Sequence, residues 1–291
     1  VWMRDGWAGL NTLTSGAPVL PDAAVDVFEF SAGQADFEAR VEVAPAKEGA
    51  VHHDIPKAIF FDAGNTLLRM NYAAIAAELA RHGAAIAADA LQRAEWRARV
   101  RLDLDLAAAR GRSTESRGTG DRYVRHMLDE AGVTDEEVIA AVTAWRRGYN
   151  PPVGVWDAAD PAALEALALA RALGVRAAVI SNSNGSVRAI LDRLGLLSSL
   201  EFVLDSSELG MEKPDPRIFR LALERARLAP EEAVYVGDIY SVDVLGARAA
   251  GIRAVLLDPG GCWGARDCEA VPDVLAAVRL VLDGTTRTTI R

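Results

Sequence analysis

Short apolar runs that end at polar, turn-forming residues recur through most of this chain. The first run, 58–61, is followed directly by Asp62 and then by Ala-Gly-Asn-Thr. A short continuous apolar run of this kind is typical of a strand buried on both faces of a parallel sheet. An aspartate at the carboxyl end of such a strand lies where open α/β sheets bind ligands, although Asp is also an ordinary turn residue.

After this run the pattern becomes helical. Apolar residues recur every three or four positions, and this spacing predicts helices over 72–81, 84–110, 122–131 and 136–149. A Ser- and Thr-rich segment over 111–120 interrupts the helices, and Asn150-Pro151-Pro152 ends them. Because no strand signal occurs in this stretch, we expect an all-helical insertion over 69–150. We interpret its Leu and Ala stripes as core. We expect solvated positions for Arg93, Arg97, Arg101 and Arg125, although one or two of them could reach a ligand.

Strand and helix signals alternate from residue 159 onward. The pattern predicts strands over 176–181, 202–204, 233–236 and 253–257, and helices over 161–173, 186–194, 216–227, 241–250 and 271–282. This alternation implies a mostly parallel sheet with helices on both faces. The predicted fold is therefore α/β, with a Rossmann-like three-layer core over 55–68 and 151–291 and an inserted all-helical cap over 69–150.

The first 54 residues differ from the rest of the chain. Residues 1–22 have no clear period and predict loop or disorder, whereas the alternation over 25–43 is typical of a β-hairpin. We interpret 45–54 as a linker whose His52-His53 pair is solvated and binds no metal. We expect 1–54 to form an N-terminal extension.

Composition and charge narrow the functional classes. The net charge of -9 disfavours binding to nucleic acid or to an anionic membrane, but leaves a small anionic substrate open. Cys262 and Cys268 are too few for a disulfide framework or a zinc site, which favours a reduced, cytoplasmic setting. No run approaches the roughly 18 apolar residues that span a bilayer, and we expect no secretory signal over 1–20.

Polar residues follow two further predicted strands and precede one helix. Ser181 and Asn182 come before a helix N-terminus, where they could bind an anion or serve as an ordinary cap. Lys213 could neutralise a phosphate and a carboxylate together, or be a surface lysine. Asp238 and Asp243 can face one point, and two clustered acids require a cation or a proton. Hard oxygen ligands of this kind suit Mg²⁺ completed by a substrate phosphate, although Asp238 could also be a turn residue.

Taken together and in this order, these elements resemble the haloacid dehalogenase superfamily of hydrolases, in its helical-cap, phosphatase-like branch. The resemblance covers about residues 56–283 and rests on the segments F-F-D-A-G-N-T-L, V-I-S-N-S, E-K-P-D-P and V-G-D-I-Y-S-V-D. It implies that Asp62 is a nucleophile forming an acyl-phosphate, and that Lys213 offsets the charge between nucleophile and phosphate. The substrate would be a small phosphate ester.

The resemblance also assigns binding roles. Ser181 and the backbone around Asn182 would hold the phosphoryl oxygens, and Thr66 would help position the nucleophile loop beside the substrate. The implied cofactor is Mg²⁺, bound by Asp62, the carbonyl of Gly64 and Asp238, with Asp243 alongside or orienting a metal-bound water.

One position departs from the family pattern. Family phosphatases usually carry a second Asp two residues after the nucleophile as general acid and base, and here that position is Gly64. General acid–base help contributes ~10²–10⁴ in rate. Slow turnover, a good leaving group or an acid supplied by the cap must therefore be considered.

Three hypotheses follow. The first is a Mg²⁺-dependent phosphatase of small phosphate esters. The second is a metal-independent haloacid dehalogenase, which also lacks the second Asp, but whose last motif resembles S-x-N-x-x-D. The third is a non-catalytic or very slow member that binds a phosphorylated ligand. Asp238 favours the metal-dependent branch.

Overall fold

The structure is a computed structural model that describes residues 51–52, 55–109, 113–283 and 285–286. These residues belong to one compact unit, Ala46–Arg291. The loop and hairpin expected over 1–43 lie outside the described residues. Within the segment interpreted as a linker, β1 (Val51–His52) pairs with β10 (Thr285–Thr286) in a short antiparallel ribbon, which the sequence pattern did not predict.

The centre of the fold is a six-stranded sheet with the strand order β6-β5-β2-β7-β8-β9. All neighbouring strands in it are parallel, which confirms the predicted sheet. The strands are β2 (Ala58–Phe61), β5 (Arg176–Ser181), β6 (Val203–Asp205), β7 (Ala233–Gly237), β8 (Arg253–Leu257) and β9 (Glu269–Val271). Since β2 lies between β5 and β7, the loops after these three strands open at the same edge of the sheet.

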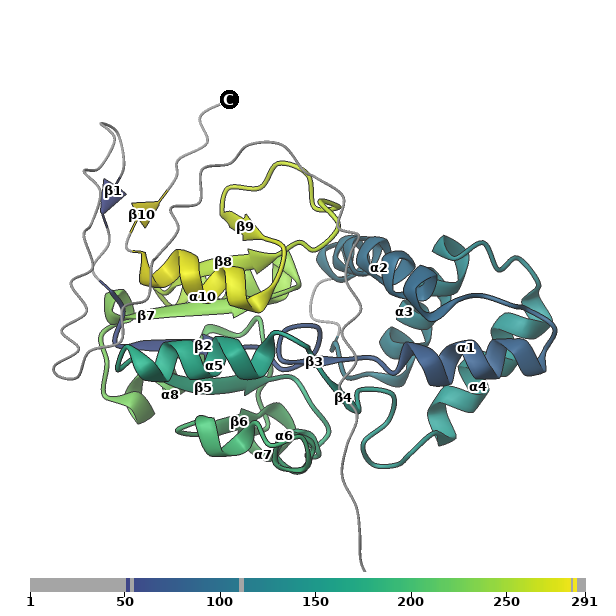
Figure 1. Cartoon of the computed structure of the whole chain (residues 1–291), viewed down its shortest axis with the longest axis horizontal. Coiled ribbons are helices and arrows are strands. Elements are labelled where there is room, and N and C mark those ends of the chain that lie inside the picture. The colour runs from purple at the N-terminus through teal and green to yellow at the C-terminus, as the bar shows by residue number, and fades with distance from the viewer. Residues whose placement is uncertain (1–50, 53–54, 110–112, 284, 287–291) are drawn as a thin grey trace, which may run out of the picture. The chain divides into compact units, whose positions relative to one another are not determined.

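Helices cover both faces of the sheet, as the three-layer prediction requires (Figure 1). On β2, Ile59 and Phe61 point into one core cluster, and Ala58 and Phe60 point into the other. The first cluster includes residues of α5 (Ala163–Ala172), α6 (Val187–Arg193) and α10 (Val274–Leu282). The second includes residues of α8 (Pro216–Ala226) and α9 (Leu245–Ala249). A strand buried on both faces therefore reads as an unbroken apolar run.

A third hydrophobic cluster holds the inserted helices together. These are α1 (Tyr72–Arg81), α2 (Ala88–Ala108), α3 (Arg117–Glu130) and α4 (Glu136–Gly148), here called the cap (Figure 1). A ribbon of β3 (Leu68–Arg69) and β4 (Ala158–Ala159) lies where the chain leaves and re-enters the core. The domain limits 69–150 stay a prediction.

Several element boundaries differ from the sequence prediction. Helix α3 begins at Arg117, five residues early, because the Ser116 hydroxyl caps it by accepting a hydrogen bond from Thr119 N. The helix expected over 241–250 starts as a π-helical turn, η3 (Tyr240–Val244), before α9. The last helix begins at Val274, since the preceding residues form β9. Short elements that were not predicted are α7 (Ser206–Leu209), η1 (Leu197–Ser199) and η2 (Pro230–Glu232).

Two further expectations concern the exposure of arginines on the cap helices and the presence of membrane-spanning helices. The side chains of Arg93, Arg97, Arg101 and Arg125 are exposed, as expected for solvated helix faces. In the part of the chain that the structure describes, no helix combines the length and apolar character needed to cross a membrane.

Candidate active site

A cavity of about 250 Å³ is lined both by the cap and by the loops after β2, β5 and β7. Its size suits a small ligand. Of the site residues predicted from sequence, those that line it are Asp62, Gly64, Ser181, Asn182, Lys213, Asp238 and Asp243. The structure therefore brings together residues that are up to 181 positions apart in the chain.

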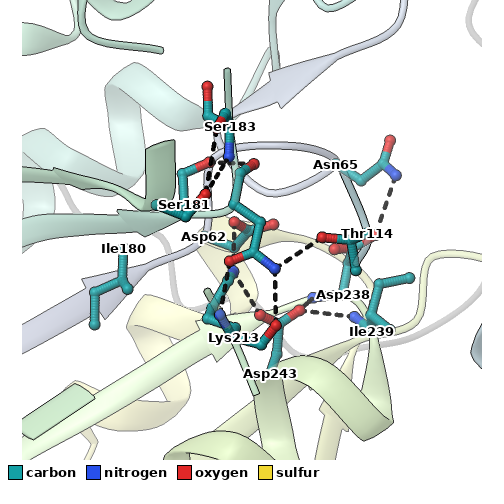
Figure 2. Close-up of polar contacts among 12 residues, drawn as sticks. Asp62, Asn65, Thr114, Ile180, Ser181, Ser183, Lys213, Asp238, Ile239 and Asp243 are labelled. Carbon is teal, nitrogen blue, oxygen red and sulfur yellow. Dashed lines mark hydrogen bonds and ion pairs between the residues drawn. The ribbon is translucent and has the colours of Figure 1, made fainter. Parts of the chain in front are cut away.

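Lys213 connects the carboxylates at the centre of this cavity (Figure 2). Its Nζ donates hydrogen bonds to Asp62 Oδ1 at 2.7 Å, to Asp243 Oδ1 at 2.8 Å and to the hydroxyl of Tyr235 at 2.8 Å. Burial opposes the charge of the lysine, but Asp243 and Asp62 raise its pKa above the ordinary value. Lys213 is thus a fixed cation, 2% exposed, and not a surface lysine.

Asp62 ends β2 with its backbone N–H bonded to Val236 O at 2.8 Å, which continues the sheet pairing to β7. Burial raises the pKa of its carboxyl to about 6, Lys213 opposes this, and Asp243 adds to it. Asp62 is 9% exposed and faces the cavity. Its carboxylate is therefore poorly hydrated and held beside one strong cation.

Asp243 has its oxygens occupied by protein donors. Its Oδ2 accepts hydrogen bonds from the backbone N–H groups of Asp238 and Ile239 at 3.0 and 2.9 Å. Its Oδ1 accepts from Lys213 and from the hydroxyl of Tyr235. Gly237 makes room for this carboxylate, since a Cβ there would lie 2.4 Å from Asp243 Cγ. These contacts indicate a residue that fixes the loop after β7, and a direct role for Asp243 beside a metal stays a prediction.

Asp238 completes a cluster of three buried acids. One carboxylate oxygen each of Asp62, Asp238 and Asp243 lies within 4.8 Å of the others. Burial raises the pKa of Asp238 well above its ordinary value, Arg99 opposes this, and Asp243 and Asp62 add to it. Such crowding of acids is costly unless a cation or a proton compensates it.

Asn182 holds Lys213 in place through its side-chain amide. Its Oδ1 accepts a hydrogen bond from Lys213 N at 2.8 Å, and its Nδ2 donates to Lys213 O at 2.9 Å. The same Nδ2 donates to Thr114 Oγ1 of the cap at 2.8 Å (Figure 2). Ser181, 3% exposed, lines the cavity beside it. Asn182 thus positions the lysine backbone, a role that its sequence context did not indicate.

The structure differs from what we expected of two parts of the phosphate-binding site, Thr66 and the loop after β5. Thr66 does not line the cavity, and its hydroxyl is buried without a hydrogen-bond partner among the described residues. In the loop after β5, the N–H groups of Ser183, Gly185 and Ser186 donate to Ser206 Oγ, Asp205 Oδ2 and Asn184 Oδ1. These N–H groups are therefore engaged within the protein, which leaves Ser181 and the backbone near Asn182 as the phosphate-binding candidates.

A buried ion pair on α2 reaches the site from the cap. Arg99 donates to Glu95 at 2.9 and 2.6 Å, and its Nη1 lies 3.4 Å from Asp238 Oδ2. Asn65 Nδ2 donates to Asp238 Oδ2 at 3.1 Å and to Tyr123 Oη at 2.8 Å. Sequence reasoning missed this network. The available signal was a carboxylate and a guanidinium four residues apart on a helix face that otherwise carries apolar residues.

We expect Arg99→Met to lower the free energy of unfolding by about 3–5 kcal/mol near neutral pH, because it leaves Glu95 buried without its cation. Glu95 and Arg99 are 0% and 3% exposed. The matched control is Arg93→Met, which removes an exposed pair with Asp89 at the same i,i+4 spacing on the same helix and should change stability little. Urea denaturation measures both, and equal effects would contradict the assigned role of the buried pair.

The chain is similar to known hydrolases. A family model described as haloacid dehalogenase-like hydrolase matches residues 56–251. Phosphoserine phosphatase from Thermus thermophilus is 41% identical over 158 residues, which are 53% of this chain and 59% of that protein. Haloacid dehalogenase-like hydrolase domain-containing protein 3 from Homo sapiens is 33% identical over 204 residues, 68% of this chain and 80% of that protein. The chain thus spans little more than half the length of the Thermus relative.

Solved structures share the fold. A dehalogenase crystal structure with an intermediate complex is 20% identical, covers 79% of this chain and 98% of its own, and has a TM-score of 0.53. The HAD hydrolase YfnB from Bacillus subtilis is 16% identical, covers 78% and 99%, and also has a TM-score of 0.53. At these identities the likeness concerns the fold alone. On the strength of the family model and the human relative, this chain belongs to the haloacid dehalogenase-like hydrolase family.

Proposed function

We propose that this chain is a Mg²⁺-dependent phosphatase that hydrolyses small phosphate esters through an aspartyl-phosphate on Asp62. The observation that carries the proposal is the buried lysine that joins Asp62 to Asp243 in a cavity of about 250 Å³. Phosphoryl transfer needs mainly positioning and charge neutralisation, and both are supplied here by fixed groups. Relatives named phosphoserine phosphatase and phosphoglycolate phosphatase support a phosphate-ester substrate.

The reaction divides into two displacements at phosphorus. In the first, an Asp62 carboxylate oxygen bonds to phosphorus, the ester P–O bond breaks, and the alcohol leaves after taking up a proton. In the second, water attacks phosphorus, the bond to Asp62 breaks, and inorganic phosphate is released as water gives up a proton. Lys213 balances the negative charge of the nucleophile and the phosphoryl oxygens, and Asn182 keeps its backbone in place.

The donor set fits a magnesium ion. Asp62 and Asp238 would hold the ion through their buried carboxylate oxygens, and Gly64, which lines the same cavity, would do so through its backbone carbonyl. Oxygen ligands at this low number suit Mg²⁺, which retains several waters. When bound, the ion would polarise the phosphoryl oxygens and offset the acid cluster. Asp243 would orient the loop that carries Asp238, since its oxygens already accept four hydrogen bonds from the chain.

Removal of magnesium tests the proposal. We expect p-nitrophenyl phosphate hydrolysis in the presence of Mg²⁺ to fall by about 100-fold or more in excess EDTA, because the ion contributes several kcal/mol of charge stabilisation. Restoring Mg²⁺ should restore the rate, and Ca²⁺ should not, because it prefers longer bonds and more ligands. Phosphate release measured by a colorimetric assay gives the readout.

Two further measurements separate the alternatives. Chloride release from a 2-chloro acid with EDTA present would favour a metal-independent dehalogenase. Saturable binding of a phosphate ester without turnover, even with activated esters, would favour a non-catalytic member. Either result would contradict the proposed phosphatase.

A further inference from the structure

The proposed reaction requires a group that can give a proton to an alcohol leaving group and take one from water. The residues that follow the nucleophile in the chain cannot do this. Gly64 has no side chain, and the amide of Asn65 donates hydrogen bonds to Asp238 and Tyr123. General acid–base help contributes about 10²–10⁴ in rate. A proton-transfer group for ordinary esters must therefore come from elsewhere in the cavity.

One loop of the cap is docked on the core at the cavity that contains the nucleophile. Ser113 Oγ donates to Glu212 Oε2 at 2.7 Å, next to Lys213 in the chain. Thr114 Oγ1 accepts from Asn182 Nδ2 at 2.8 Å, the amide that also holds the Lys213 backbone (Figure 2). Glu115 follows these two anchors and lines the same cavity as Asp62. Two hydrogen bonds to the core thus fix the loop that carries this carboxyl.

The surroundings of Glu115 suit proton transfer near neutral pH. Burial raises the pKa of its carboxyl to about 7, the nearby Asp62, Glu212 and Asp205 add to this, and Lys213 opposes it. Taken over the whole residue, however, Glu115 is exposed to solvent, so its proton can exchange with water. A general acid or base works best when its pKa lies near the working pH.

Among the described residues, the other ionisable side chains that line the cavity already have a partner or a role, or are unsuited to proton transfer. Tyr123 donates to Glu95, and burial together with Glu95 holds its pKa well above the ordinary value. The lining also contains Arg117 and Arg146, and Arg146 pairs with Asp121 at 2.9 Å. Arginine does not act as a proton donor in proteins. The remaining members are Asp62, Lys213, Asp238 and Asp243, which the proposed function already uses.

We propose that Glu115 is the general acid and base of this enzyme, acting from the cap in the role that Gly64 cannot perform. The inference rests on the proposed phosphatase function. In the first displacement the Glu115 carboxylic acid gives its proton to the alkoxide oxygen as the ester P–O bond breaks, and becomes a carboxylate. In the second, that carboxylate takes a proton from the attacking water as the Asp62–phosphorus bond breaks, which regenerates the acid.

The test compares Glu115→Gln with the native chain on two esters. With an alkyl phosphate we expect turnover to fall by about 100-fold or more, since the alkoxide must be protonated to leave. With p-nitrophenyl phosphate, whose leaving group needs no proton, we expect one equivalent of nitrophenolate at close to the native rate. A slow steady state should follow, because hydrolysis of the phosphoenzyme lacks its base.

The pH dependence gives a second readout. In single turnovers of the native enzyme, alkyl phosphate cleavage should decline above about pH 7, because the acid form of Glu115 is lost, and this decline should be absent in Glu115→Gln. Glu212→Gln should move the decline to lower pH, since Glu212 raises the Glu115 pKa and the glutamine can still accept the Ser113 hydrogen bond. Glu137→Gln, on an exposed face of α4, is the control.

Restoring an acid at position 64 adds a rescue experiment. A Cβ at Gly64 would lie 3.7 Å from the Trp156 ring, an ordinary contact, so Gly64→Asp can be accommodated. In the Glu115→Gln background, we expect Gly64→Asp to raise the rate of alkyl phosphate hydrolysis by about tenfold. General acid–base catalysis supplies ~10²–10⁴ in rate, so this is a partial rescue.

An equal loss of the first-turnover cleavage rate on both esters would overturn the role of Glu115. So would a pH profile that is the same in Glu115→Gln as in the native chain, together with no rescue by Gly64→Asp. Failure of the native chain to cleave any phosphate ester would instead overturn the proposed function.

Discussion

Asp62→Asn should abolish phosphate ester hydrolysis, with kcat reduced by roughly 10⁴-fold or more, the range seen when a nucleophile or its partner is removed. The amide is similar in shape to the carboxylate but cannot form the acyl-phosphate. Its oxygen can still accept the hydrogen bond from Lys213 Nζ, which is 2.7 Å from Asp62 Oδ1 in the native chain. The variant should therefore fold and lose only the chemistry.

Three measurements make this prediction specific. Acid quenching with labelled substrate should trap a phosphoenzyme in the native chain and none in Asp62→Asn. Thermal unfolding should show a cooperative transition in both. The control Asp192→Asn, on an exposed position of α6, should keep the native rate. If Asp62→Asn retains phosphatase activity that depends on Mg²⁺, the nucleophile lies elsewhere.

The core of the fold could be predicted because its signals are local. The run 58–61 is apolar without a break because β2 is buried on both faces, and its end at Asp62 places that carboxylate at the open edge of the sheet. The short edge strand β9 was missed, since its pattern is only partly buried and three residues long. The π-helical start of the segment after Asp238 was missed because helix periodicity does not distinguish it from an ordinary turn.

The site was predicted only where residues end strands or begin helices. Tyr235 sits inside an apolar strand, so nothing in its neighbours indicates that its hydroxyl contacts Lys213 at 2.8 Å. Glu95 and Arg99 belong to a long polar helix on which most charges are solvated, and their burial depends on how the cap packs against the loop that carries Asp238. Glu115 lies in a segment with no period at all. These contacts depend on tertiary packing between segments, which single-sequence patterns do not encode.

Lys213→Met should reduce both stability and activity, because it removes the cation that two buried carboxylates share. Asp243 is 1% exposed and Asp62 is 9% exposed, so neither can be rehydrated in place. Breaking a buried ion pair from one side costs about 3–5 kcal/mol in the free energy of unfolding. Loss of a fixed positive group at the reacting phosphate should lower kcat by about 10²–10³ in addition.

The stability loss should depend on pH in a defined direction. Without the lysine, burial and the nearby Asp243 raise the pKa of Asp62 in the folded chain further above its value in the unfolded chain, because Lys213 lowers the pKa of Asp62 in the native site. The folded variant then binds more protons than the unfolded one, so its stability falls as the pH rises. Urea denaturation should therefore find Lys213→Met closest to the native chain at mildly acidic pH and furthest from it above neutrality.

A second lysine provides the matched control. Lys57 pairs with Glu232 at the surface, with 65% of its side chain exposed, and Lys57→Met should change stability far less because water already screens that pair. Activity should be compared well below the unfolding temperature, so that loss of folded protein does not count as loss of catalysis. If Lys213→Met is no less stable than Lys57→Met and shows no pH dependence of its own, then Lys213 does not hold the acid cluster together. The cavity would then need another source of positive charge before phosphate could bind beside Asp62.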